Sequence, residues 1–263
     1  MNKIKCLVSS ATIANNRDFN KPNEDYILYN EEYGIYILLD GVTRTHSEYT
    51  DGTSAAFDAG KIFAERVYEY LIENISDIQE DDAPAILKSA VIEGNIAIEK
   101  YRSKKSLQEW GYYPAAVGIV ALIYNKTLHY ICAGDSLGVI LRGTSKIYFG
   151  EQQTIKAVDI NRISKEIRYA EYCNHPEHDL SYALFNGDSS LVEAMEQSFI
   201  DIHPGDIIIF ASDGVGNYIK YEKADKLKSV TPDEMTELSV VYDKPPYATY
   251  SDDKAVIKIE CVV

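Results

Sequence analysis

Two apolar segments that each lead into Asp-Gly constrain this chain more than any other feature of its sequence. The run from Ile35 to Leu39 is continuously apolar and ends in Asp40 and Gly41. The run from Ile207 to Ala211 leads through one serine into Asp213 and a second glycine. Short apolar runs bounded by such residues favour strands that are covered on both faces. Asp-Gly is also ordinary turn chemistry, which would explain one copy alone, but two matched copies favour carboxylates held at the ends of buried strands.

Length and charge narrow the classes of function. A chain of 263 residues can bury a large core, and we expect one domain spanning residues 1–263. Its 46% hydrophobic and 25% charged residues are typical of a globular protein. The formal net charge of −15 argues against nucleic acid or an anionic membrane as a partner, because both are bound through clustered Lys and Arg.

The cysteines and the apolar runs bear on the cellular compartment of the protein and on its association with membranes. Cys6, Cys132, Cys173 and Cys261 lie far apart and have no paired spacing of the zinc type, so we expect a reducing, cytoplasmic setting. The longest apolar run, Ala115 to Tyr124, is about half the length that a membrane-spanning helix needs. We therefore expect no membrane partner.

Hydrophobic periodicity predicts a mixture of helices and strands. Helical spacing of apolar residues predicts amphipathic helices at Thr53–Ile75 and Ala83–Tyr101, a helix near Asn161–Tyr172 and short helices after Asp213. Short apolar runs between turn residues predict further strands. We expect strands at Ile4–Thr12, Tyr26–Tyr29, Gly34–Asp40, Ala115–Tyr124, Thr127–Ala133, Leu137–Leu141, Ile207–Ala211 and Lys254–Val263. The spacing of Ala115–Tyr124, Thr127–Ala133 and Leu137–Leu141 predicts that these three form an antiparallel meander.

Acidic residues recur at the predicted strand ends and turns. Asp25 begins one strand and Asp40 ends the next, so an antiparallel hairpin would bring the two together. Further acids stand at Asp135, Asp213 and Asp252. Carboxylates packed together without compensation repel one another, and hard divalent cations such as Mg²⁺ or Mn²⁺ would neutralise them. His175 and His178 lack further ligands nearby, so we expect them in a surface loop.

Five short motifs, in this order, closely resemble those of the metal-dependent serine/threonine protein phosphatases of type 2C, the PPM family. The motifs are Asn23-Glu24-Asp25, Asp40-Gly41, Gly134-Asp135-Ser136, Ser212-Asp213-Gly214 and Asp252-Asp253. The resemblance implies an α+β fold, a four-layer α-β-β-α sandwich of two antiparallel sheets with a binuclear metal site at one end. It also implies hydrolysis of phosphoserine or phosphothreonine in a protein substrate by a metal-bridged hydroxide.

The resemblance also implies roles for single residues. Two Mn²⁺ or Mg²⁺ ions would be held by Asp25, Asp40, the Gly41 carbonyl, Asp213 and Asp252, and a third would lie at Asp135 and Asp213. Asp40 and Asp213 would be essential for catalysis. Glu24 and Asp253 would lie behind the metal ligands.

Departures from the family pattern leave the mechanism open. Asn20 stands where the family has an arginine that grips the phosphate, and Lys21, Arg17 and Arg44 are the candidate replacements. His46 lies one position from the family histidine that protonates the leaving group, and it is equally well explained as an exposed loop residue. A signalling phosphatase is thus our first hypothesis. The alternatives are a pseudophosphatase that binds a phosphoprotein or other partner without turnover, and a phosphatase for small phosphorylated metabolites.

Overall fold

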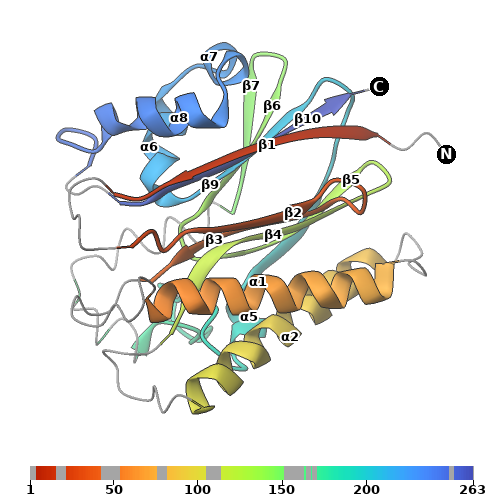
Figure 1. Cartoon of the computed structure of the whole chain (residues 1–263), viewed down its shortest axis with the longest axis vertical. Helices are drawn as coiled ribbons and strands as arrows, with labels where there is room; N and C mark the ends of the chain where they lie inside the picture. The colour runs from red at the N-terminus through yellow and green to blue at the C-terminus, as the bar shows by residue number, and fades with distance from the viewer. Residues whose placement is uncertain are drawn as a thin grey trace.

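The chain folds into four layers in the computed structural model, which describes residues 4–15, 22–42, 54–75, 82–104, 114–150, 163, 167, 171–248 and 252–262. Two antiparallel sheets lie face to face in the middle, and helices cover the outer face of each (Figure 1). The described part of the chain therefore has the α-β-β-α arrangement that the sequence predicts.

Each sheet has five strands. The first sheet has the order β1-β10-β9-β6-β7, and the second has the order β2-β3-β4-β5-β8. All neighbouring strands are antiparallel. The first sheet comprises β1 (Lys5–Ile13), β10 (Lys254–Val262), β9 (Ile207–Ala211), β6 (Leu137–Arg142) and β7 (Ser145–Phe149). The second comprises β2 (Tyr26–Asn30), β3 (Ile35–Gly41), β4 (Ala116–Tyr124), β5 (Thr127–Ala133) and β8 (Glu196–Asp201).

The helices are amphipathic and turn their apolar sides to the sheets. Helices α1 (Ala55–Asn74) and α2 (Ala83–Lys104) cover the second sheet. On α1 the buried residues Ala59, Phe63, Val67 and Leu71 recur every four residues, which places them on one face. The first sheet is covered by α6 (Asp213–Tyr221), α7 (Ala224–Ser229) and α8 (Pro232–Ser239). The described residues also form two short helical elements, α5 (Leu191–Ala194) and η4 (Val240–Tyr242).

Strand β3 explains why its sequence is apolar at every position. Ile35, Ile37 and Leu39 pack against α1 and α2, whereas Tyr36 and Leu38 point into the core between the two sheets. All five side chains are fully buried, and each of the four aliphatic ones contributes about 1.5–3 kcal/mol of hydrophobic stabilisation. A strand buried on both faces is what the continuous apolar run predicts.

Two lysines on strands of the first sheet hold its outer helical layer in place. The Nζ atom of Lys146, on β7, donates to the carbonyl oxygens of Ile219, Lys220 and Glu222 at 2.8–2.9 Å. The Nζ atom of Lys258, on β10, donates to two carbonyls at the end of α7 at 2.7 and 2.9 Å. These carbonyls have no partner within their helices, so the lysines satisfy them and complement the negative ends of the helix dipoles.

The predicted meander is wrong in its last strand. β4 and β5 do pair as expected, but β6 lies in the other sheet, between β9 and β7. The second edge of β5 is taken by β8, which we did not predict, and β7 was also missed. Gly134, with φ +71°, therefore carries the chain from one sheet to the other instead of closing a hairpin. The helix predicted near Asn161–Tyr172 falls largely outside the described residues.

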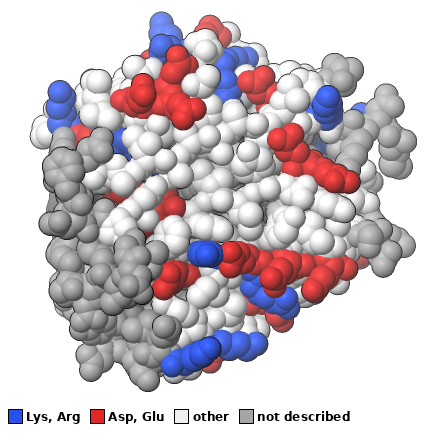
Figure 2. Space-filling model, viewed as in Figure 1, with Lys and Arg blue, Asp and Glu red and all other residues white. Residues whose placement is uncertain are grey.

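Most other predicted elements are confirmed within a few residues of their expected ends. The strands Ile4–Thr12, Tyr26–Tyr29 and Gly34–Asp40 correspond to β1, β2 and β3. None of the helices in the described part of the chain combines the length and the apolar character needed to cross a membrane. Figure 2 shows a band of acidic side chains across the face that it draws. On α1, Glu65 and Glu69 are exposed.

Candidate metal centre

The hairpin of β2 and β3 brings the first two predicted acids together. Tyr26 pairs with Leu39 in its register, so Asp25 and Asp40, one position further on each strand, lie opposite each other. Asp25 is buried, with 3% of its surface exposed, and Asp40 is partly exposed. The antiparallel argument from the sequence is therefore confirmed for this pair.

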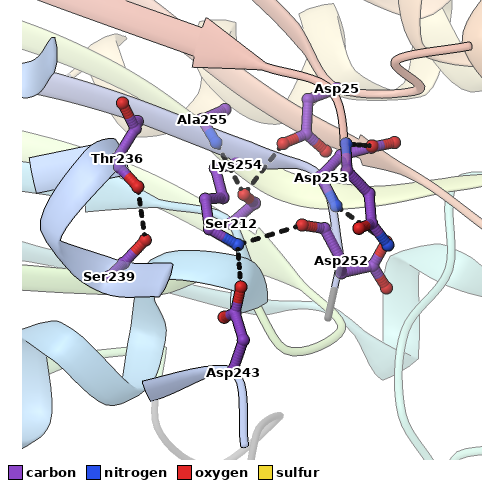
Figure 3. A network of polar contacts seen from close by, with 10 residues as sticks. Asp25, Ser212, Thr236, Ser239, Asp243, Asp252, Asp253, Lys254 and Ala255 are labelled. Carbon is purple, nitrogen blue, oxygen red and sulfur yellow. Dashed lines mark hydrogen bonds and ion pairs between the residues drawn. The ribbon is translucent and has the colours of Figure 1, made fainter. Parts of the chain in front are cut away.

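A serine connects this hairpin to the first sheet. Ser212 directly follows β9. Its hydroxyl donates to Oδ2 of Asp25 at 2.9 Å. The same hydroxyl accepts from the backbone N–H of Ala255 at 2.9 Å, and the N–H of Ser212 donates to the carbonyl of Ala255 at 3.1 Å (Figure 3). Ser212 thus fixes the carboxylate of Asp25 against the start of β10, and Asp213 follows as the first residue of α6.

Asp253 holds the loop that precedes β2. Its Oδ1 accepts from the backbone N–H of Asn15 at 2.7 Å, and its Oδ2 accepts from that of Glu24 at 2.9 Å. The N–H of Asp253 donates in turn to Oδ1 of Asp252 at 2.9 Å. The side chain of Glu24 accepts from the hydroxyl of Ser54, the residue that caps α1. Glu24 and Asp253 therefore occupy supporting positions around the acids that the sequence singled out.

Close packing, in addition to turn chemistry, explains the two Asp-Gly pairs. A Cβ atom on Gly41 would lie 2.8 Å from both the Cβ and the carbonyl oxygen of Glu24. A Cβ atom on Gly214 would lie 2.0 Å from the carbonyl oxygen of Asp253. Both distances are below any ordinary contact, so any other residue would push apart the segments that carry the acids. The glycines let these segments meet.

Several of these acids lie close enough for their charges to raise one another's pKa. Burial raises the pKa of Asp25 well above its usual range, with further upward contributions from Asp253, Asp252 and Asp213, against a lowering hydrogen bond from Ser212. Burial also raises the pKa of Asp40, and the charges of Asp25, Asp213, Asp252 and Asp135 raise it further. The predicted acids from four separate parts of the chain therefore influence one another.

The chemistry of these groups fits a hard divalent cation. Oδ1 of Asp25 is buried and accepts no hydrogen bond from the residues that the structure describes, which leaves a carboxylate oxygen ready for a cation. The donor set is all oxygen, the set that Mg²⁺ and Mn²⁺ prefer. Within the described ranges, however, no three His, Cys, Asp or Glu side chains already stand in an arrangement that could hold a metal ion. The fit therefore rests on donor chemistry and on the orphaned oxygen of Asp25.

Several predicted site residues lie outside the described residues. These are Lys21, Arg44 and His46, together with Asn20 and Arg17. Their roles in phosphate binding and proton transfer remain predictions. His175 and His178 are placed in an exposed turn, where Nδ1 of His175 lies 3.1 Å from Oε1 of Glu177. The prediction of a surface loop for this pair of histidines is confirmed.

The sequence reasoning missed two residues that organise this region. Ser212 was quoted only as part of a motif, although a hydroxyl directly before a strand-end acid could have suggested a hydrogen-bonding role. Lys254 starts β10 and is buried, with 3% of its surface exposed. Its Nζ donates to Oδ2 of Asp243 at 2.7 Å and to the carbonyl of Asp252 at 3.2 Å. No local sequence pattern links Lys254 with Asp243.

Comparisons of sequence give no family, whereas comparisons of structure give many similar folds. No protein-family model and no curated protein sequence matches the chain. The serine/threonine phosphatase PstP/Ppp of Mycobacterium tuberculosis has a TM-score of 0.67 and 19% identity, over 99% of this chain and 100% of that one.

Two further solved structures are similar over nearly their whole length. The PstP catalytic domain in complex with two manganese ions has a TM-score of 0.65 and 18% identity, over 100% of both chains. The PPM Ser-Thr phosphatase MsPP of Mycobacterium smegmatis, in complex with cacodylate, has a TM-score of 0.61 and 16% identity, over 97% of this chain and 98% of that one. The chain therefore has the fold of the PPM-type serine/threonine phosphatases.

Proposed function

We propose that this chain is a metal-dependent phosphatase, one domain over residues 1–263, that hydrolyses phosphoserine or phosphothreonine in a protein. The observation that carries the proposal is that Asp25 and Asp40 lie opposite each other, with Asp213 and Asp252 close enough to raise the pKa of both, in a fold shared with PPM-type phosphatases. A cytoplasmic place in signalling belongs to the same proposal and rests on the cysteine spacing and the family resemblance.

The proposed ligands divide between the two sheets. Asp25, Asp40 and the Gly41 carbonyl come from the β2–β3 hairpin, and Asp213 and Asp252 come from the ends of β9 and β10. Two Mn²⁺ or Mg²⁺ ions held there, with a third at Asp135, would neutralise the carboxylates and activate a water for attack on phosphorus. The chain's own contribution is to hold these acids in place through Ser212, Glu24 and Asp253, as the hydrogen bonds above describe.

Two substitutions test the assignment. Asp40→Asn and Asp213→Asn preserve shape and remove one charge each, and we expect each to abolish hydrolysis of a phosphothreonine peptide. Glu65→Gln, on the exposed face of α1, removes one charge from a residue outside the proposed ligand set and is the matched control that should retain activity. Full activity in both aspartate variants would reject the proposed ligand set.

A panel of substrates distinguishes the kind of phosphatase. We expect faster hydrolysis of phosphothreonine and phosphoserine peptides than of sugar phosphates or nucleotides. Faster hydrolysis of a metabolite would favour a phosphatase for small molecules. The proposed metal ligands would be the same in that case.

The pseudophosphatase alternative rests on a specific feature of the sequence. Asn20 replaces the arginine that the family uses to grip the phosphate, and an asparagine carries no charge for this task. Binding of Mn²⁺ seen by calorimetry, without hydrolysis of any substrate in the panel, would favour this alternative.

A further inference from the structure

Two cysteines from opposite ends of the chain lie directly across from each other. Cys6 on β1 pairs with Cys261 on β10 in the antiparallel register of the first sheet. Figure 1 shows these two strands side by side, with both termini of the chain at the same end. Two cysteines that lie far apart in the sequence are therefore neighbours in the sheet.

The backbone hydrogen bonds identify the type of cross-strand pair. The N–H of Cys261 donates to the carbonyl of Asp206 at 2.9 Å, and its carbonyl accepts from the N–H of Gly205 at 2.7 Å. Both groups therefore point away from β1, so Cys6 and Cys261 form a non-hydrogen-bonded pair. Such pairs have the closer Cα separation, about 4.5 Å, which is within the range that disulfides span.

Both thiols point into the core between the sheets. Cys261 belongs to this core and is 2% exposed, while Cys6 packs against its edge and is partly exposed. A hydrogen bond with the Cys6 thiol, together with burial, raises the pKa of the Cys261 thiol well above its usual range. The two thiols therefore lie on neighbouring strands at the same core, and solvent reaches the pair from the side of Cys6.

We propose that Cys6 and Cys261 form an oxidisable dithiol, a modification site that reacts with a low-molecular-weight disulfide such as oxidised glutathione to join the first and last strands. The other two cysteines lie opposite residues of other types. Cys132 on β5 pairs with Ile119 and Glu196, and Cys173 forms an isolated bridge with Tyr182.

The reaction balances in two exchanges. The Cys6 thiolate attacks one sulfur of glutathione disulfide, which breaks the S–S bond and releases one glutathione that takes up the proton lost by Cys6. The Cys261 thiolate then attacks the sulfur of Cys6 in this mixed disulfide. The Cys6–Cys261 bond forms, and the second glutathione leaves with the proton from Cys261. Two electrons pass from the protein thiols to the glutathione disulfide.

The modification would strengthen the sheet without touching the candidate metal centre. The bond closes a loop of nearly the whole chain, and long loops gain the most from closure in the chain-entropy account. Cys261 lies seven residues after Lys254 on the same strand, which is about 23 Å at ~3.3 Å per residue. We therefore expect a Tm higher by about 5 °C or more in the oxidised protein, and unchanged hydrolysis.

The test uses the full-length protein and glutathione disulfide. After treatment, intact mass and peptide mapping should show a Cys6–Cys261 disulfide in the wild type, which dithiothreitol reverses together with the rise in Tm. Cys261→Ala should instead stop at a glutathione adduct on Cys6, because its second thiol is gone. Cys132→Ala is the control and should still form the disulfide. A circular dichroism spectrum checks that each variant is folded.

Two results would overturn the proposal. One is a wild type that stays reduced, or that stops at the Cys6 adduct, under conditions in which Cys261→Ala forms that adduct. The other is an oxidised wild type that melts no higher than the reduced protein. Neither result depends on catalytic activity, so the proposed phosphatase function stands or falls separately.

Discussion

The buried ion pair between Lys254 and Asp243 gives the sharpest prediction about stability. Their Nζ and Oδ2 atoms are 2.7 Å apart, and the two side chains are only 4% and 8% exposed. Lys254 also contacts the carbonyl of Asp252. The pair therefore links the residue after η4 to the start of β10. The proposed metal ligand Asp252 lies between the two residues in the sequence.

Removing one member of the pair should cost more than removing both. Lys254→Met keeps the length of the side chain but leaves the Asp243 carboxylate buried without its lysine, and Asp243→Asn leaves the ammonium group in the same position. Breaking a buried pair in this way costs about 3–5 kcal/mol. With an unfolding entropy of ~2.1 cal/mol/K per residue, this corresponds to a fall in Tm of about 5–9 °C for this chain.

A double-mutant cycle measures the pair directly. We expect Lys254→Met with Asp243→Asn to lose less stability than the sum of the single variants, with a coupling of at least ~2 kcal/mol, because no buried charge is left uncompensated. The assay is thermal unfolding followed by circular dichroism, without metal. Lys244→Met, one residue after Asp243 and exposed, is the matched control and should shift Tm by less than about 1 °C. Additive single variants, or a Lys254→Met protein as stable as the control, would refute the reasoning.

Three further predictions concern the candidate metal centre. Ser212→Ala removes the hydrogen-bond partner of both Asp25 and the N–H of Ala255, so we expect the free energy of unfolding to fall by about 1–3 kcal/mol. The control Ser229→Ala, at an exposed position on α7, should leave it nearly unchanged. Gly214→Ala should lower Tm and weaken Mn²⁺ binding measured by calorimetry, because the added Cβ would overlap the Asp253 carbonyl. Its control is Gly216→Ala, where the added Cβ meets open space and neither quantity should change. Because burial and neighbouring acids raise the pKa of Asp25 and Asp40, the folded protein in chelator holds their protons more tightly than the unfolded chain. Its Tm should therefore fall as pH rises from their ordinary range near 3.8 toward neutrality, and Asp40→Asn should flatten this fall; a Tm that rises across this window in the wild type would contradict the assignment.

The parts of the fold that the sequence predicts are those governed by nearby residues. The uninterrupted apolar run of β3 predicts burial on both faces, and the turn before it predicts the hairpin that pairs Asp25 with Asp40. The four-residue spacing on α1 likewise predicts the buried face of the helix. In each case, contacts within one element or between consecutive elements determine the outcome.

The parts that the sequence does not predict depend on residues far apart in the chain. The position of β6 is decided by β8, which competes for the free edge of β5 from more than 60 residues further on. Lys254 and Asp243 pair across 11 positions of the chain, and Cys6 lies opposite Cys261 only because the first and last strands are neighbours. The motif order located the acids, but their supporting contacts with Ser212 and Asp253 became visible only in the fold.

Hydrolysis of a phosphothreonine peptide with Mn²⁺, with Mg²⁺ and with chelator tests the central claim most directly. The account predicts turnover that requires a divalent ion, disappears in chelator, returns when the ion is restored, and is absent in Asp40→Asn. Turnover that persists in chelator, or that Asp40→Asn retains in full, would contradict it.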